Sequence, residues 1–262
     1  MLTAPDLLLT RSDMSDPRLY CPEKLINGAR LQLGRDESHY LISVMRRREG
    51  EKVRLFNAED GEWSAVVTAA DRKQATLDVA GQLRPPAKVP DLDLLFAPVK
   101  KNRTDFIVEK ATELGVRAIR PVITHRTIAG KVRTDRLRAL AKEAAEQTER
   151  LDLPEIADAV QLDTCLSDWP SGRPLIFCDE AGDAPLMPDA LAGLADGGVS
   201  ILIGPEGGFS PEERERIRAL PSSVPVSLGP RILRADTAAV AALTLFQALR
   251  GDWAARAQAR EN

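Results

Sequence analysis

The chain has 262 residues, of which 44% are hydrophobic and 29% are charged, and its formal net charge at pH 7 is −3. This length suits two domains of unequal size. Apolar runs stay well short of the roughly 20 residues that a membrane-spanning helix needs. The leucine run at 7–9 is too short for the core of a signal peptide. We therefore expect a cytoplasmic protein, with Met14 as an alternative start to Met1.

The cysteines and histidines do not predict a metal site. Cys21, Cys165 and Cys178 are widely separated and odd in number, so they offer neither a disulfide framework nor metal-ligand spacing. The chain has two histidines, His39 and His125. We expect no metal, and we interpret the three thiols as buried structural groups.

Residues 18–84 predict a small β-barrel, preceded by an N-terminal extension at 1–17. Short apolar runs alternate there with turn-forming stretches, and one helix is expected at 37–46. The strands are expected at 52–56, 63–68 and 75–79. A Pro-rich segment at 85–91 predicts a semi-rigid linker.

Residues 92–250 alternate strand and helix patterns, which is typical of an α/β domain with a parallel sheet. Residues 251–262 are expected to form a C-terminal tail. Strands are expected at 92–97, 118–123, 175–178, 200–203 and 224–228. Helices are expected at 103–114, 134–150, 211–219 and 237–249.

The loop at 203–210 (IGPEGGFS) follows one of these strands and predicts a ligand recess. Its three glycines permit positive φ and a close approach of a ligand to the backbone. Ser210 and Glu213 match a capping box, with Pro at the first helical position. The chain has neither a phosphate-binding P-loop nor a dinucleotide-binding turn, and Glu206 lies inside the loop. These features favour a neutral or cationic adenosine-like ligand; the alternative is a tight turn without a ligand.

A second loop at 228–237 (LGPRILRADT) follows the next strand and leads into an Ala-rich helix. It places two guanidinium groups and two aliphatic side chains together. Aliphatic groups cover an adenine or a thioether, and an arginine holds a phosphate or an oxyanion. Because ligands bind at the carboxyl ends of strands in α/β sheets, both loops are predicted to share one pocket.

These loops resemble the signature of the ribosomal RNA small-subunit methyltransferase E family, which are 16S rRNA uracil-N3 methyltransferases of the SPOUT superfamily. Further segments are similar to that family, so that the resemblance extends over residues 18–250. These segments are 38–53, 98–101, 110–116 and 143–147. One departure is Asp236, where the family has Glu in R-x-E-T-A; the carboxylate is withdrawn by one methylene.

The resemblance implies an α/β fold with an N-terminal PUA-like RNA-binding β-barrel and a C-terminal SPOUT domain that contains a deep trefoil knot. It implies a homodimer that binds S-adenosylmethionine and methylates 16S rRNA in the small ribosomal subunit. The expected cofactor contacts are Gly204, Pro205, Gly207, Gly208, Leu228, Gly229, Ile232 and Leu233.

Methyl transfer to N3 of a uracil requires loss of the N3 proton and stabilisation of negative charge on the ring oxygens. We interpret Arg234 as the residue that stabilises this charge. Glu206 is a candidate sulfonium partner or proton acceptor. The base is left open between Glu206, Asp236 and a water molecule.

Charge is distributed unevenly along the chain. Residues 100–150 contain 13 Lys or Arg and 7 Asp or Glu, which predicts a basic face for phosphate contact. A solvated helix surface is the alternative interpretation. The RNA-binding candidates are Arg46, Arg47, Lys100, Lys101 and Arg103.

Helical spacing places four polar side chains on one face: Glu143, Glu146, Gln147 and Arg150. This face is either the solvent-exposed side of an amphipathic helix or part of the substrate or dimer cleft. Lys110 and Glu113 are expected to form a surface ion pair. Two other functions remain open: ribose 2′-O methylation of transfer RNA, and non-catalytic ribosome assembly. The intact loops argue against the second.

Overall fold

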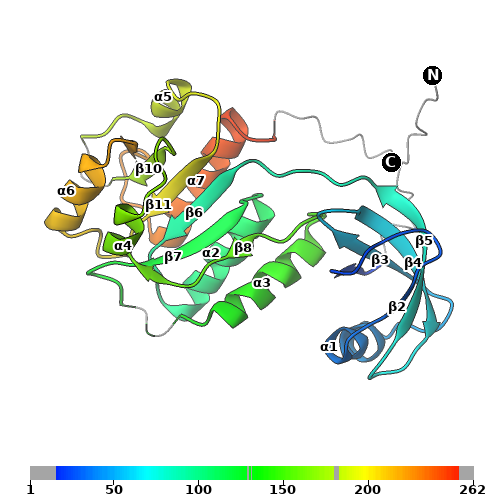
Figure 1. Cartoon of the computed structure of the whole chain (residues 1–262). Coiled ribbons are helices and arrows are strands. Elements are labelled where there is room, and N and C mark those ends of the chain that lie inside the picture. Colours follow the sequence, from blue (N-terminus) through cyan, green and yellow to red (C-terminus); the bar gives the residue numbers. More distant parts are fainter. Residues whose placement is uncertain (1–15, 129, 131, 180–182, 254–262) are drawn as a thin grey trace, which may run out of the picture. The chain divides into compact units, whose positions relative to one another are not determined.

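The computed structural model describes residues 16–128, 130, 132–179 and 183–253 (Figure 1). Residue contacts divide them into two compact units. One comprises the described residues up to 88 together with 145–153, and the other comprises 89–144 and 154–253. Met14 and most of the predicted extension and tail lie outside the described residues.

The first unit contains a five-stranded sheet with the strand order β1-β3-β4-β5-β2. β1 and β3 are parallel, and the other neighbours are antiparallel. The strands are β1 (Arg18–Tyr20), β2 (Arg30–Gln32), β3 (Lys52–Asn57), β4 (Gly61–Ala69) and β5 (Thr76–Arg84). The expected helix is present as α1 (Arg35–His39), which continues as a π-helix, η2 (Tyr40–Val44). β1 and β2 were not predicted, because three residues are too few to show an alternating pattern.

The turn between β3 and β4 forms where the sequence predicts it. The Asn57 side-chain oxygen accepts hydrogen bonds from the backbone N–H groups of Glu59 and Asp60, at 3.0 and 2.7 Å. Gly61 follows with a φ of 78°, which is costly for a residue with a Cβ. The side-chain amide and the glycine therefore fix the register of this hairpin.

Glu62 is a fully buried carboxylate surrounded by three arginines. Its oxygens lie 2.6 Å from Arg18 Nε, 2.7 Å from Arg84 Nε and 3.6 Å from Arg54 Nη1. Arg18 also donates to the carbonyl oxygens of Ala145 and Arg150, both at 2.7 Å. The cluster therefore anchors the 145–153 segment to the sheet.

The carboxylate of Glu149 belongs to the same cluster, 3.0 Å from Arg54 and 3.0 Å from Arg84. Burial raises the pKa of this carboxyl. Hydrogen bonding to Arg54 and the nearby guanidinium charges lower the pKa by more than burial raises it. The net pKa lies below its ordinary value, so Glu149 remains ionised and keeps its two ion pairs at neutral pH.

The second unit is built on a parallel sheet with the order β12-β10-β11-β6-β7-β8, and β9 also pairs with β7. Every pairing in it is parallel, as predicted. The strands are β6 (Leu92–Phe96), β7 (Ala118–Ile123), β8 (Glu155–Ile156), β9 (Val160–Gln161), β10 (Leu175–Cys178), β11 (Val199–Ile203) and β12 (Ser223–Val226). The helices are α2 (Lys101–Glu113), α3 (Thr134–Gln147), α4 (Leu162–Ser167), α5 (Met187–Ala192), α6 (Pro211–Ala219) and α7 (Ala235–Leu249).

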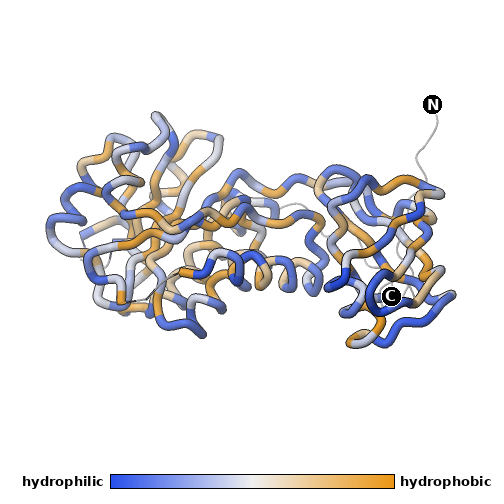
Figure 2. Tube along the Cα trace, turned by 60° about the horizontal axis from the view of Figure 1, so that its bottom comes forward, coloured by the Kyte–Doolittle hydropathy of each residue, from blue (hydrophilic) through white to orange (hydrophobic). Residues whose placement is uncertain are grey.

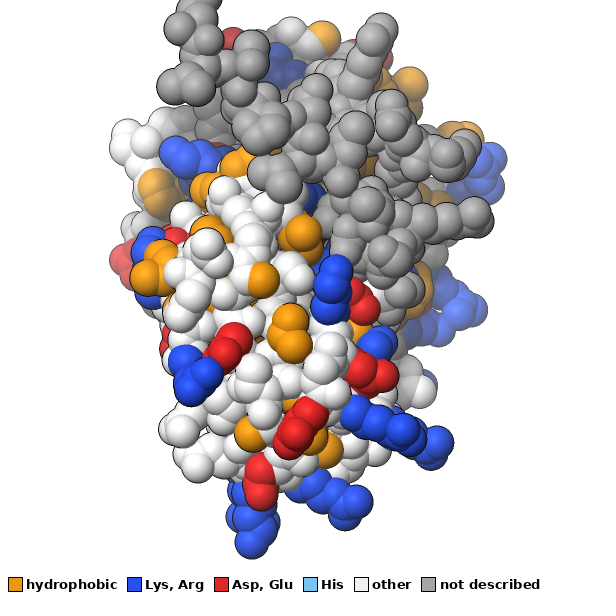
Figure 3. Space-filling model, turned by 90° about the vertical axis from the view of Figure 1, so that its right-hand side faces the viewer, with side chains coloured by type: hydrophobic (Ala, Val, Ile, Leu, Met, Phe, Trp, Pro, Cys, Tyr) orange, Lys and Arg blue, Asp and Glu red, His pale blue; other side chains and the backbone are white. Residues whose placement is uncertain are grey.

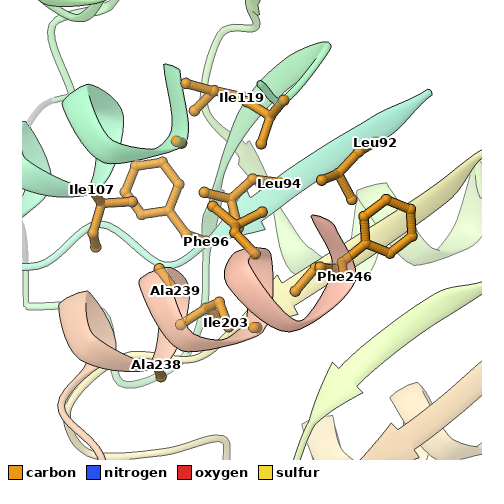
Figure 4. Packing of buried hydrophobic residues seen from close by; sticks show 14 of the residues in the cluster. Leu92, Leu94, Phe96, Ile107, Ile119, Ile203, Ala238, Ala239 and Phe246 are labelled. Atoms are coloured by element: carbon orange, nitrogen blue, oxygen red, sulfur yellow. The ribbon is translucent and has the colours of Figure 1, made fainter. Parts of the chain in front are cut away.

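Every residue of the central strands β6 and β11 is buried, as parallel strands covered on both faces require. On one face the strands pack against α2 and α7, and Phe96 lies close to Ile107 and Ala239 (Figure 4). Each unit has its own hydrophobic core, and hydrophobic residues recur along the trace of both (Figure 2). No helix among the described residues is long and apolar enough to span a membrane.

The helix expected at 134–150 ends earlier, at Gln147. Glu149 has a φ of 64° and breaks the helix, and Arg150 is buried. The predicted stripe of four residues on one helix face is therefore wrong at Arg150, because the helix ends before this residue. The carbonyl oxygen of Arg150 is bound by Arg18 instead of by a helical N–H group. The predicted ion pair between Lys110 and Glu113 is confirmed, at 2.6 Å.

Glu62→Gln is expected to lower the free energy of unfolding by about 3 kcal/mol or more, because it leaves buried arginines without their counter-ion. Asp78→Asn is a matched control. Its ion pair with Arg30 has a similar distance, 2.7 Å, but both side chains are exposed, so the loss should be under about 1 kcal/mol. Chemical denaturation measures both, and equal losses would contradict the anchoring role of Glu62.

Candidate active site

A pocket of about 650 Å³ lies at the carboxyl ends of β10, β11 and β12. These three strands are parallel neighbours, so the segments that follow them converge at one edge of the sheet. Both loops singled out in the sequence line this pocket. The lining residues are Cys178, Asp179, Ala184, Leu186, Ile203 to Gly208, Val226 to Leu233, Ala235 and Ala238. All eight expected cofactor contacts are among them.

The first loop is anchored at its far end by the predicted capping box. Ser210 Oγ accepts from Glu213 N at 3.2 Å, and Glu213 Oε2 accepts from Ser210 N at 2.9 Å. Glu213 also accepts from His125 N at 2.7 Å, and Arg126 donates to the carbonyl oxygen of Gly207 at 2.7 Å. The loop after β7 therefore supports the recess from outside.

The glycines of the first loop serve different purposes. Gly208 has a φ of 68° and needs the freedom of glycine. Gly204 does not adopt positive φ; a Cβ there would lie 2.6 Å from the ring of Phe209. At Gly207 a Cβ would make only ordinary contact with Arg126. Of the three glycines, which all permit positive φ, Gly208 is therefore the one that uses it.

The second loop is held by backbone pairing with the segment that precedes α5. Ser227 N donates to the carbonyl oxygen of Pro185 at 2.8 Å, and Met187 N donates to that of Ser227 at 3.0 Å. Gly229 has a φ of 112°. At the pocket rim, Ile232 is 90% exposed, whereas Leu233 packs against the main core. The loop thus combines a fixed base with an exposed apolar rim.

The two catalytic candidates occupy different positions. Glu206 lines the pocket, with a side chain that is 30% exposed. Arg234 is exposed and stands at the N-cap of α7, outside the set of lining residues. α7 begins at Ala235, slightly earlier than expected, and Asp236 lies in its first turn.

The sequence did not point to Asp179, which forms part of the pocket wall. It is buried, and its carboxylate accepts from Nε of Arg214 at 2.9 Å and of Arg218 at 2.8 Å. Hydrogen bonds from Arg218 to Asp183 and Asp179 hold the pKa of Arg218 above its ordinary value. A signal was available, because Asp179 directly follows a predicted strand, but it lies outside the two glycine-rich motifs.

The RNA-binding candidates fall into two groups. Arg46 and Arg47 follow η2 in the first unit; Arg46 has a φ of 57°, and the buried Nε of Arg47 has no hydrogen-bond partner among the described residues. Lys100 and Lys101 are exposed at the start of α2. Arg103 is directed elsewhere, toward Glu206 at 3.5 Å and Asp236 at 3.7 Å.

Much of the positive charge at 100–150 is paired with acidic side chains, several of which lie outside the segment. The pairs are Arg117 with Asp91 and Asp93, Arg120 with Asp93, Arg136 with Asp105, and Arg150 with Asp152. In the first unit, Lys and Arg side chains are interspersed with Asp and Glu on the face that Figure 3 displays. The excess of arginines in the sequence therefore overstates the basic surface.

Of the three cysteines, only Cys21 is buried, whereas Cys165 and Cys178 are partly exposed and Cys178 lines the pocket. The expectation of three buried thiols is wrong for these two, because Cys165 lies in the short helix α4 and Cys178 ends β10 at the pocket. The described residues contain no group of three or more His, Cys, Asp and Glu side chains that could hold a metal ion.

Comparisons with known proteins agree with this geometry. Residues 85–247 match the model of an RNA methyltransferase domain, and residues 33–80 match an RNA methyltransferase PUA domain. The chain is 30% identical over 234 residues to ribosomal RNA small subunit methyltransferase E of Rickettsia conorii, covering 88% of this chain and 95% of that protein. The Bacillus subtilis enzyme of the same name is 27% identical, over 83% and 91%.

Two solved structures are similar over most of the chain. A methyltransferase from Legionella pneumophila, in complex with S-adenosylmethionine, has a TM-score of 0.82 at 30% identity, covering 90% of this chain and 99% of that one. Ribosomal RNA small subunit methyltransferase E from Neisseria gonorrhoeae, bound to S-adenosylmethionine, has a TM-score of 0.81 at 28% identity, over 91% and 99%.

These matches confirm the expected α/β fold, with a PUA-like N-terminal unit and a parallel C-terminal sheet. They also confirm the family that the two loops resemble. The chain belongs to the ribosomal RNA small subunit methyltransferase E family and is an RNA methyltransferase.

Proposed function

We propose that this enzyme transfers a methyl group from S-adenosylmethionine to N3 of uracil 1498 in 16S rRNA. The observation that carries the proposal is the convergence of the two loops, 203–210 and 228–237, around one pocket at the carboxyl ends of three parallel strands. Two similar proteins hold S-adenosylmethionine, and two relatives are named for ribosomal RNA of the small subunit.

The pocket suits S-adenosylmethionine in size and chemistry. Its volume of about 650 Å³ is within the usual range for small-molecule sites. Backbone groups of Gly204, Gly208 and Gly229 line it, and Leu228 and Leu233 supply apolar cover for an adenine. Gly208, at positive φ, keeps the recess open where a Cβ would be strained.

When bound, S-adenosylmethionine supplies an electrophilic methyl group on a sulfonium. The protein must remove the N3 proton of the uracil and stabilise the negative charge that spreads to the ring oxygens. Arg234 is the proposed charge-stabilising residue, because the N-cap of α7 holds its backbone beside the second loop. Glu206 lines the pocket and is available to a sulfonium or to a proton.

The remaining features are proposals as well. Phosphate contacts are assigned to Arg46, Arg47, Lys100 and Lys101, which lie on exposed segments or turns. The domain limits are 18–84 and 92–250, joined by a linker at 85–91, with 1–17 and 251–262 as extension and tail. Ribosomal RNA as substrate places the enzyme in the cytoplasm.

A knotted homodimer completes the proposal. Leu186, which precedes α5, forms a parallel bridge with Ser227 before the second loop. The trefoil knot is proposed from the resemblance of the two loops to the family. Four alanines of α7 are buried in the core, so the exposed Ile232 and Leu249 are apolar side chains offered to a second copy. Light scattering that gave the monomer mass at micromolar concentration would contradict the dimer.

A strain that lacks the gene is expected to lose 3-methyluridine from its 16S rRNA, because this enzyme is the proposed source of that methyl group. Mass spectrometry of nucleosides from purified small subunits measures the loss. Complementation with the wild-type gene is the control and should restore the nucleoside. Retention of 3-methyluridine, with loss of a different methylated nucleoside, would assign another substrate.

Gly208→Val is expected to abolish measurable binding of S-adenosylmethionine while the fold is retained, because a β-branched residue disfavours a φ of 68° and fills the recess. Titration calorimetry measures the affinity, and circular dichroism checks the fold. Gly172→Val is a matched control that should keep the affinity, because Gly172 also has a positive φ, 77°, but does not line the pocket. Unchanged affinity in Gly208→Val would move the cofactor site elsewhere.

Arg234→Ala is expected to slow methylation about 100-fold or more, because a charge-stabilising contact in the transition state is lost. Affinity for RNA should stay near that of the wild type. Lys100→Gln with Lys101→Gln should do the reverse: weaker RNA binding and a salt dependence flatter by about one unit of slope per lost phosphate contact. Methylation of small subunits by Arg234→Ala at the wild-type rate would refute the proposed role.

A further inference from the structure

Arg103 lies between carboxylates contributed by two different elements. Its Nη1 atom is 3.5 Å from Oε1 of Glu206 in the first loop, and its Nε atom is 3.7 Å from Oδ2 of Asp236 in α7. The three side chains are 31%, 30% and 21% exposed. One guanidinium from the start of α2 therefore bridges the two segments that the sequence marks as functional.

Both contacts are longer than the 2.7–2.9 Å that is usual for a charge-assisted hydrogen bond. The Arg136 contact with Asp105 and the Arg117 contact with Asp93, the latter 2.6 Å, show how closely this chain packs other pairs. A guanidinium has five N–H donors. Arg103 therefore neutralises Glu206 and Asp236 by charge without occupying their lone pairs tightly, so either carboxylate is still able to accept a proton from a third group.

A second cavity of about 280 Å³ opens on the far side of this arrangement. It is lined by Lys100, Arg103, Ile128 and Glu206. Glu206 lines the larger pocket as well and is the one residue that lines both. Its carboxylate therefore stands where a group in the small cavity would meet a cofactor in the large pocket.

We propose that Glu206 is the general base that takes the N3 proton, and that Arg103 is the positioning residue that holds Glu206 and Asp236 side by side. This inference rests on the proposed function. In the step, the N3–H bond breaks, its proton passes to Glu206, and the nitrogen electron pair becomes available to form the bond to the methyl carbon. The small cavity then holds the pyrimidine.

The geometry of the cluster gives this role a measurable signature. Arg103 is held between Glu206 in the first loop and Asp236 in α7, and Arg126 binds the carbonyl oxygen of the neighbouring Gly207. Removal of Arg103 takes away the contact that positions the Glu206 side chain, but the pocket keeps the anchors of its two loops. The loss should therefore be in kcat and not in the affinity for S-adenosylmethionine.

The test compares Arg103→Gln, Arg103→Lys and Lys110→Gln. Lys110 is a matched control seven residues further along the same helix: it is 33% exposed, pairs with Glu113 and lines neither cavity. The assay measures kcat and KM for 3-methyluridine formation on unmodified small subunits. It is combined with titration of S-adenosylmethionine and with the salt dependence of RNA binding.

Arg103→Gln is expected to lower kcat about 10-fold or more, with KM for the subunit and affinity for S-adenosylmethionine within about twofold of the wild type. Arg103→Lys should recover part of the lost kcat, because it restores the positive charge beside both carboxylates. Lys110→Gln should behave as the wild type in every measurement.

Two outcomes would overturn the inference. In one, Arg103→Gln keeps kcat but binds RNA more weakly, with a flatter salt slope, which makes Arg103 a phosphate contact. In the other, it keeps every parameter. Absence of 3-methyluridine with the wild-type enzyme is a separate result, because it would refute the proposed substrate and this inference together.

Discussion

The parallel pairing of β12, β10 and β11 is the constraint on which the candidate site depends. Parallel strands end at the same edge of a sheet, so the chain after each of these three strands must enter the same region. β11 is buried along its whole length, so the strand that leads into the first loop is held in the core. The direction of the strands thus sets the position of the pocket, and the loops determine which chemical groups line it.

Rigidity of the loops follows from contacts at their ends. The Ser210 capping box and the bond from Arg126 to Gly207 hold the first loop, and the backbone bonds of Ser227 hold the second. Such anchoring preorganises backbone groups for a ligand and lowers the entropy lost on binding. The exposed side chains Ile232 and Arg234 are carried on this fixed frame, which leaves their rotamers adjustable while their Cα positions are set.

Charged side chains in this protein form ion pairs with one another more than they form a uniformly charged surface. The buried Glu62 binds three guanidinium groups in the first unit, and Asp179 binds two in the second. Burial of a carboxylate is costly unless its partners are close and hydrogen-bonded. The arginines that satisfy these carboxylates are consequently unavailable to a polyanion, and the same holds in weaker form for Arg103 beside Glu206 and Asp236.

The sequence by itself determined the fold class, most of the longer elements and the two loops of the site. Long apolar runs and the Ser210 cap are local signals, and α6 begins and ends at the predicted residues. The short strands β1 and β2, the end of α3 and the position of Arg103 were decided only by the tertiary structure. A strand of two or three residues is too short to show an alternating pattern. Arg18 binds the carbonyl oxygen of Ala145 in the last turn of α3, and the two residues are 127 positions apart in the sequence. Pairing of a guanidinium depends on where distant carboxylates fold, so a charge count along the chain could not distinguish an arginine held by Glu206 from one offered to phosphate.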